Sequence, residues 1–532
     1  MKHKQYKKII LVVLDGFGVA HMGNGNAISL AKTPNFDYLV NNFPAFTLQA
    51  SGPLVGLPWG EMGNSEVGHL NIGAGRIVGQ DLPKITNAIQ TGEFLKNPVF
   101  VEAVEHTKKY NSKLHVMGLV STGGVHSLDE HVYALLGIAK EHQQPNVFVH
   151  MFTDGRDTEP RAALDAVKRM NERIVRIGVG SIASISGRFY GMDRGGHWAQ
   201  TELVYQALVN GAGEKARSPE DCIQQNYAAQ ITDETIRPTV IFNPDNEPEA
   251  VISANDAVIF FNFRPDRATQ LTQLFVDPAA VPEEFRHAPI ENLYFATMTE
   301  YLPGLSVHVA FPKTSLHNSL GEVISNNNMT QFHIAESEKY AHVTVFFNCG
   351  RGETFPGEDR VIVDSPNNSH NYSDQPEMSA PELTRQFVEQ ITSGNYNFYL
   401  ANFANGDMVG HTGILQSGIK AVESLDVCIR QIADVCLAAD AVLIVTADHG
   451  NVEQMVNPKT GDIDKDHTTN PVPFLLIGNE FKFAQPSGRQ YSSLAGEVPI
   501  GVISDIAPTI LDLYGLPKPG EMTGISLFDE IR

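Results

Sequence analysis

Short runs of hydrophobic residues recur along the chain and alternate with longer stretches of helical periodicity. Runs of strand length lie at residues 9–14, 146–152, 258–263, 398–403 and 441–447. Residues 419–439 instead repeat their apolar positions with the spacing of an amphipathic helix. This alternation predicts an α/β fold in which the sheets are largely parallel and flanked by helices.

Polar residues follow each of these five runs directly. In chain order, the continuations are Asp15, TDGRD, RPDR, ANGDMVGH and DHGN. In open α/β sheets, ligands bind beyond the carboxyl ends of the strands, so side chains at these positions can converge on one site. The pattern therefore predicts that functional residues lie at the strand ends.

Two joins that contain Gly and Pro, at residues 73–81 and 302–315, divide the chain. The segment between them, residues 80–312, holds 12 of the 19 arginines. We expect this segment to form an inserted domain. Residues 1–79 and 313–532 would then form one discontinuous domain.

The composition limits the partners and the compartment of this protein. Its 532 residues include 39 Lys and Arg against 61 Asp and Glu, a formal charge of −22. This acidity argues against general binding to nucleic acid or to an anionic membrane, but not against a small anionic substrate. The four cysteines form no CxxC pair, and no apolar run approaches the ~18 residues of a membrane span, so we expect a cytoplasmic protein.

Carboxylate and imidazole side chains of the metal-ligating kind stand at three of these strand ends and in one further loop: Asp15, Asp407, His411, Asp448, His449 and His467. Mixed ligands of this kind suit Mn, Zn or Fe better than Ca or Mg. Six candidates are enough for two metal ions. Taken singly, each residue could instead be a helix cap, a turn residue or a surface histidine.

Ser65 is the candidate nucleophile. It lies in the Gly-rich stretch PWGEMGNSEVGHLNIGAG, residues 58–75, which could begin a helix and offer backbone N–H groups to phosphate oxygens. A neighbouring metal ion would activate the hydroxyl. The alternative is that Ser65 only caps the helix.

The inserted segment carries the candidate binding site for a small polyanion: His126, Arg156, Asp157, Arg188, Arg194, Arg264 and Arg267. Guanidinium groups bind phosphate and carboxylate through paired hydrogen bonds. In such a site Asp157 could act as general base to a substrate hydroxyl. Alternatively, the arginines form surface ion pairs, and Asp157 only orients Arg156.

These residues belong to motifs with a specific order: DGFG, MGNSEVGHLNIGAGR, STGGVHS, FTDGRDT, SGRFYGMDR, NFRPDR, SEKYAHVTVFFN, FPGEDR, NGDMVGHTG, TADHGN and HTTNPVP. From about residue 7 to 528 the chain resembles the cofactor-independent (2,3-bisphosphoglycerate-independent) phosphoglycerate mutases of the alkaline phosphatase superfamily. The resemblance implies a two-domain monomer, with a phosphatase-like domain and an inserted transferase domain. It also implies interconversion of 3- and 2-phosphoglycerate in glycolysis through a phosphoserine, without 2,3-bisphosphoglycerate.

The resemblance also implies a role for each residue of the site. One Mn²⁺ would be held by Asp407, His411 and His467, and a second by Asp15, Ser65, Asp448 and His449. Ser65 would be the phosphorylated nucleophile, and Lys339 of the SEKY motif would lie beside the transferring phosphate. Phosphoglycerate would be bound by His126, Arg156, Asp157, Arg188, Arg194, Arg264 and Arg267.

Two other functions remain open from the sequence. A phosphatase, phosphodiesterase or different phosphomutase could use the same metal scaffold, and its product would distinguish it: inorganic phosphate instead of 2-phosphoglycerate. A non-catalytic protein that binds phosphoesters or metals could keep the fold without the chemistry. Loss of a candidate ligand would indicate such a protein, and the sequence keeps all of them.

Overall fold

Both ends of the chain belong to the same folding unit. The computed structural model describes residues 5–313, 315–366, 371–528 and 530–531. Contacts divide the chain into a first unit, Met1–Gln80 with Ser315–Arg532, and a second unit, Asp81–Thr314. In the part of the chain that is described, no helix is long and apolar enough to cross a membrane.

The first unit is built on an eight-stranded sheet with the order β12-β11-β13-β1-β14-β15-β2-β16. The strands from β12 to β14 run parallel, β15 is antiparallel to both of its neighbours, and β16 is parallel to β2. Their bounds are β1 Ile9–Leu14, β2 Ala45–Gln49, β11 Gln331–Glu336, β12 Glu358–Val363, β13 Phe398–Phe403, β14 Val442–Thr446, β15 Val472–Ile477 and β16 Gly501–Val502.

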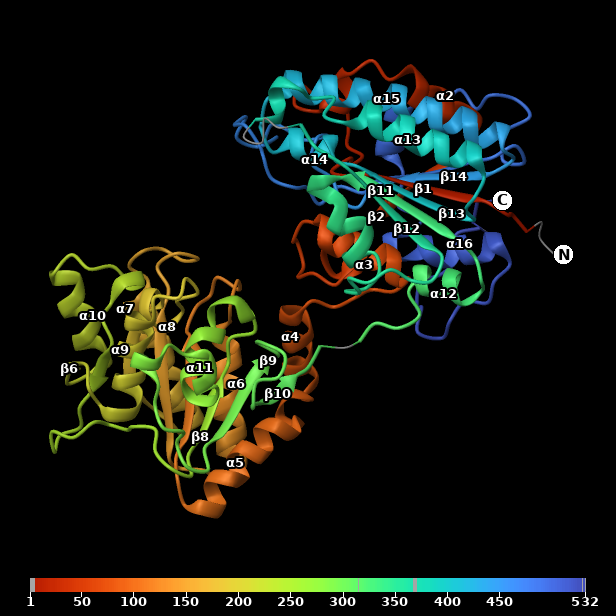
Figure 1. Cartoon of the computed structure of the whole chain (residues 1–532). Coiled ribbons are helices and arrows are strands. Elements are labelled where there is room, and N and C mark those ends of the chain that lie inside the picture. The colour runs from red at the N-terminus through yellow and green to blue at the C-terminus, as the bar shows by residue number, and fades with distance from the viewer. Residues whose placement is uncertain (1–4, 314, 367–370, 529, 532) are drawn as a thin grey trace. The chain divides into compact units, whose positions relative to one another are not determined.

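Helices cover both faces of this sheet (Figure 1). One face packs against α2 (Pro34–Asn42), α13 (Ala380–Ser393) and α15 (Leu415–Ala438), and the other against α3 (Ser65–Ala74), α12 (Leu320–Asn326) and α16 (Ile506–Tyr514). The short helices α1 (Ala27–Leu30) and α14 (Asn405–Gly410) complete the unit. Because β1 is covered on both sides, all six of its residues are buried, which explains its unbroken apolar run.

The second unit has a sheet of its own, with the order β10-β9-β8-β3-β4-β5-β7-β6. The strands from β10 to β5 run parallel, and only the pair of β5 and β7 is antiparallel. Their bounds are β3 Leu114–Leu119, β4 Val147–Thr153, β5 Ser181–Gly187, β6 Glu214–Ala216, β7 Thr239–Ile241, β8 Ala257–Phe260, β9 Tyr294–Thr299 and β10 His308–Phe311.

Two hydrophobic cores lie on opposite faces of this second sheet. Leu114 and Val116 of β3 belong to one core, and Met117 and Leu119 belong to the other. The first core includes α4 (Asp81–Thr91), α5 (Pro98–Tyr110), α6 (Asp129–Glu141), α7 (Ala163–Ile177) and α10 (Pro219–Ala228). The second includes α9 (Trp198–Asn210) and α11 (Thr269–Val276), and α8 (Arg188–Gly191) packs nearby.

The predicted α/β fold with two largely parallel sheets is confirmed. The strand expected at 258–263 is shorter, because β8 ends at Phe260. Beyond it, the N–H of Phe263 donates to the carbonyl of His126, so the backbone leaves the sheet and joins the loop that follows β3. The helix expected at 419–439 begins earlier, at Leu415.

Candidate active site

Ser65 is the first residue of α3 and is buried. The capping residue is Asn64, whose side chain accepts a hydrogen bond from the N–H of Val67 at 3.0 Å. The alternative that Ser65 merely caps the helix is therefore wrong. A Cβ on Gly68 would lie 2.6 Å from the Cβ of Asp448, so only glycine lets α3 approach the end of β14 this closely.

The hydroxyl of Ser65 lies at the centre of a group of charged side chains. Its Oγ is 3.0 Å from Asp15 Oδ1, 3.0 Å from His449 Nε2 and 2.7 Å from Lys339 Nζ. The Lys339 ammonium also donates to Asp15 Oδ1 at 2.7 Å and to Asp407 Oδ2 at 2.6 Å. One buried cation thus connects the serine to two carboxylates that come from different strand ends.

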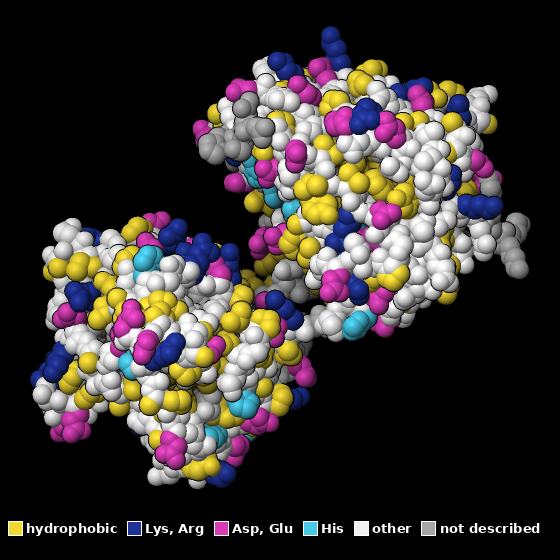
Figure 2. All heavy atoms as spheres, in the orientation of Figure 1, with side chains coloured by type: hydrophobic (Ala, Val, Ile, Leu, Met, Phe, Trp, Pro, Cys, Tyr) yellow, Lys and Arg dark blue, Asp and Glu magenta, His cyan; other side chains and the backbone are white. Residues whose placement is uncertain are grey.

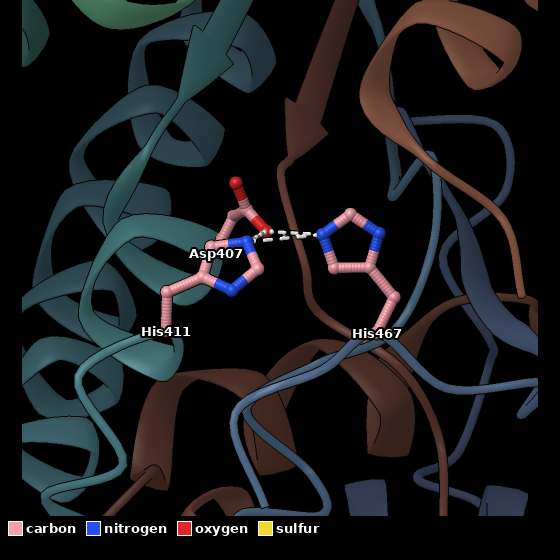
Figure 3. A group of neighbouring side chains, drawn as sticks. All are labelled: Asp407, His411 and His467. Carbon is pink, nitrogen blue, oxygen red and sulfur yellow. Dashed lines mark hydrogen bonds and ion pairs between the residues drawn. The ribbon is translucent and has the colours of Figure 1, made fainter. Parts of the chain in front are cut away.

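Asp407, His411 and His467 form the first of two groups with metal-ligand geometry (Figure 3). The two Nε2 atoms lie 3.1 and 3.0 Å from Asp407 Oδ1, and 3.1 Å from each other. The Nδ1 atoms lie 2.7 and 2.8 Å from the carbonyl oxygens of Lys465 and Gly63. If both Nδ1 atoms donate to these carbonyls, three lone pairs converge on one point, which a cation would stabilise.

Asp15, Asp448 and His449 form the second group, at the ends of β1 and β14. All three side chains are fully buried, and His449 Nε2 lies 3.4 Å from Asp15 Oδ1. Asp448 Oδ2 accepts no hydrogen bond within the described residues. Buried carboxylates are costly without a counter-charge, so the donor sets of both groups fit metal ions with mixed nitrogen and oxygen ligands.

The charges of this site depend on one another. Burial raises the pKa of Asp15 and Asp407, but the Lys339 ammonium and the neighbouring histidines together outweigh it and hold both well below the usual range. Burial lowers the pKa of His449, but Asp448, Asp15 and Asp407 raise it to about 9. A metal ion on His449 Nε2 would therefore compete with a proton.

In the second unit, Arg188 connects two carboxylates at the end of β4. Its Nη1 lies 2.7 Å from Asp154 Oδ1 and 2.5 Å from Asp157 Oδ2, and only 3% of its side chain is exposed. Asp154 Oδ1 also accepts from the N–H groups of Arg156 and Asp157, at 3.2 and 2.9 Å. Asp157 therefore pairs with Arg188 and not with Arg156, which contacts Glu234 at 3.4 Å.

Asp266 is a second acid that contacts several cations of the predicted binding site. Asp266 contacts Arg194 at 2.6 Å, Arg264 at 3.2 Å and His126 at 3.7 Å. Arg267 Nη1 donates to the carbonyl oxygen of Met192 at 3.2 Å, and burial, Arg194 and Arg188 lower the pKa of its guanidinium. Burial and Arg188 lower the pKa of His126 to about 4, which leaves it neutral near pH 7.

The first unit thus brings its sequence-predicted residues together around Ser65. In the second unit, Asp157 pairs with Arg188, whereas Arg156, Arg194 and Arg264 form the exposed ion pairs of the alternative interpretation. Dark-blue Lys and Arg side chains gather at one edge of the second unit in the space-filling view (Figure 2). The sequence analysis missed four buried or half-buried partners, Asp154, Asp266, His69 and Asn402. All four lie inside motifs or strand ends that it had quoted, but nothing in the local sequence indicates which side chains they contact.

Known proteins of one family are similar to this chain over almost its whole length. A family model described as "BPG-independent PGAM N-terminus" matches residues 85–303. A 2,3-bisphosphoglycerate-independent phosphoglycerate mutase of Chloroflexus aurantiacus is 46% identical over 541 residues, with 98% of each chain covered. One from Clostridioides difficile is 47% identical over 528 residues, covering 98% of this chain and 99% of its own.

One solved structure is also similar to this chain over almost its whole length. Leishmania mexicana phosphoglycerate mutase, described as crystallised at low cobalt concentration, superposes with a TM-score of 0.61. It is 27% identical, and the match covers 99% of this chain and 98% of that one.

Proposed function

The chain belongs to the 2,3-bisphosphoglycerate-independent phosphoglycerate mutases, and we propose that it interconverts 3- and 2-phosphoglycerate through a phosphoserine at Ser65. As a member of this family it is an isomerase of glycolysis that acts on a small phosphorylated acid and needs no 2,3-bisphosphoglycerate. The observation that carries the proposal is the Ser65 hydroxyl, held within 3.0 Å of Lys339, Asp15 and His449 between two metal-ligand groups.

The first half of the proposed reaction uses the residues of the first unit. The Ser65 hydroxyl loses its proton, and its oxygen attacks the phosphorus of 3-phosphoglycerate in line. The bond to the 3-oxygen breaks, and that oxygen takes up a proton, which leaves phosphoserine and glycerate. The Lys339 ammonium lies 2.7 Å from the attacking oxygen and offsets the negative charge that develops there. Bound metal ions would stabilise the serine alkoxide and the phosphoryl oxygens.

The second half uses the residues of the second unit. We assign the binding of glycerate and its carboxylate to His126, Arg156, Arg188, Arg194, Arg264 and Arg267. Asp157 accepts the proton of the 2-hydroxyl as that oxygen attacks the phosphoserine, and Arg188 fixes the orientation of its carboxylate. Glycerate must stay bound between the two transfers, because exchange with water would turn the enzyme into a phosphatase.

Two Mn²⁺ ions are the proposed metals. We assign one to Asp407, His411 and His467, and the other to Asp15, Ser65, Asp448 and His449. The two groups found among the described residues support two ions, and their imidazole content favours Mn²⁺ over Ca²⁺ or Mg²⁺. We further propose a cytoplasmic monomer, in keeping with the four free cysteines.

One experiment separates this proposal from its alternatives. The purified enzyme is assayed for conversion of 3-phosphoglycerate with Mn²⁺ and without 2,3-bisphosphoglycerate, then with excess chelator, and Ser65→Ala is assayed beside it. We expect 2-phosphoglycerate as product, loss of activity with chelator, and no turnover by Ser65→Ala, in which Asp15, Asp448 and His449 still hold the second Mn²⁺. Inorganic phosphate as the main product would indicate a phosphatase, and normal turnover by Ser65→Ala would exclude the phosphoserine.

A further inference from the structure

A line of buried polar side chains lies behind the second metal-ligand group. His69 belongs to α3 and is fully buried. Its Nδ1 lies 2.9 Å from the carbonyl oxygen of Ser65 and 3.1 Å from Asp448 Oδ2. Its Nε2 lies 3.0 Å from Asn402 Nδ2. Asn402 Nδ2 also donates a hydrogen bond to Asp15 Oδ2 at 2.8 Å.

These contacts indicate which ring nitrogen of His69 carries a hydrogen. Nδ1 is hydrogen-bonded to the carbonyl oxygen of Ser65 and therefore carries the hydrogen, whereas Nε2 faces an amide N–H and accepts. The N–H of Nδ1 also lies next to Asp448 Oδ2, as an electrostatic contact and not as a hydrogen bond. The amide of Asn402 uses one hydrogen for His69 and the other for Asp15. A line of contacts thus runs from Asp15 through Asn402 and His69 to Asp448.

This line reaches one metal-ligand group and not the other. Asp15 and Asp448 are two of the three members of the group that also includes His449. Across the described parts of the chain, no hydrogen bond or ion pair joins His69 or Asn402 to the other group, which consists of Asp407, His411 and His467. Any effect of His69 on metal binding should therefore fall on one ion.

We propose that His69 is a positioning residue that orients Asp15 and Asp448 as ligands of one metal ion. The proposal rests on the two-ion site of the proposed function. A carboxylate held from behind presents a fixed oxygen to the metal, and partners of this kind typically contribute ~10–100-fold to metal affinity. The same imidazole N–H contacts the Ser65 carbonyl, so it also holds the start of α3 against the end of β14.

Two substitutions separate the two ends of the ring. His69→Gln places an amide oxygen near the position of Nε2, where it can still accept from Asn402, but removes the N–H that lies next to Asp448 Oδ2. His69→Asn places an amide nitrogen near the position of Nδ1 and keeps an N–H beside Asp448 and the Ser65 carbonyl, but loses the acceptor for Asn402. We expect His69→Gln to weaken one Mn²⁺ by ~10–100-fold and leave the other unchanged, with a smaller loss in His69→Asn.

His333→Asn is the matched control. His333 is also fully buried in the first unit, and its Nδ1 lies 2.8 Å from the carbonyl oxygen of Val343. None of its hydrogen bonds reaches a candidate metal ligand. We expect this variant to lose thermal stability without losing affinity for either ion.

The measurement is a titration of the full-length metal-free enzyme with Mn²⁺, with free Mn²⁺ followed by electron paramagnetic resonance. Thermal unfolding of each metal-free variant is recorded in parallel. Selective loss of one ion in His69→Gln but not in His333→Asn supports the proposal. Unchanged binding, equal weakening of both ions, or the same loss in His333→Asn overturns it.

The two proposals fail in different ways. If the wild-type enzyme binds one Mn²⁺ only, the two-ion part of the proposed function is wrong. The role of His69 is then decided by whether His69→Gln weakens that single ion more than His333→Asn does. If His69→Gln does not fold, His69→Asn tests the proposal from the other end of the ring: it loses the acceptor for Asn402 and should weaken the same ion more than His333→Asn does.

Discussion

Arg188→Met removes the single buried cation between Asp154 and Asp157. Arg188 is 3% exposed and lies 2.7 and 2.5 Å from the two carboxylates. Breaking a buried ion pair by deleting one partner typically costs ~3–5 kcal/mol, because the other charge stays buried without compensation. At ~1.4 kcal/mol per tenfold, this corresponds to roughly a hundredfold or more in the opening equilibrium of the second unit.

Hydrogen exchange of the full-length protein, followed by mass spectrometry, measures this loss in each unit separately. We expect faster exchange in peptides from β4 and β5 in Arg188→Met, with peptides from β1 and β14 unchanged. Lys168→Met is the control, because Lys168 and Asp165 form an exposed pair of the same unit, worth ~0–1 kcal/mol. An equal effect of the two substitutions would refute the assignment of Arg188 as a buried anchor.

The difference in stability between wild type and Arg188→Met should depend on pH in a definite direction. Burial raises the pKa of Asp154, but hydrogen bonds from Ser121 and the 154–157 turn, together with Arg188, lower it below its usual value. A lowered carboxyl pKa contributes stability that is fully present above the unfolded pKa of ~3.9 and is lost as the pH falls through the folded value. The stability gap between wild type and Arg188→Met should therefore narrow below about pH 4.

Three further substitutions test the site. Lys339→Met removes the ammonium that contacts the Ser65 oxygen and should lower kcat by ~10²–10³-fold in the coupled assay. An effect on KM alone would contradict the role of Lys339 in the transfer step. Asp157→Asn should slow turnover by ~10²–10⁴-fold, while phosphoserine still forms from the substrate and is detected by mass spectrometry after acid quench. If no phosphoserine forms, Asp157 acts in the first transfer instead. His126 has a folded pKa of about 4, so it contributes stability that is lost as the pH falls from the unfolded pKa of ~6.5 toward 4. In urea unfolding, His126→Gln should therefore lose less stability between pH 7 and 5 than the wild type does. Equal losses in both proteins would mean that His126 is not buried as a neutral group.

The sequence alone determined the fold class and where the polar groups stand. Apolar runs such as residues 9–14 specify strands buried on both faces, and Asp15 must then lie at a carboxyl end. The motifs also indicated which residues to examine, including Ser65 and Asp157. These features are local, because burial period and strand ends depend on residues that are neighbours in the chain.

Only the tertiary structure decided which of these side chains meet. The sheet order places β1 between β13 and β14, and Lys339 reaches Asp15 across 324 positions of sequence. The same packing pairs Asp157 with Arg188 instead of Arg156, and it places His69 Nδ1 3.1 Å from Asp448 Oδ2. Hydrophobic periodicity specifies which face of a strand is buried but not which strand lies beside it, so contacts across the sheet follow from the packing of the whole unit.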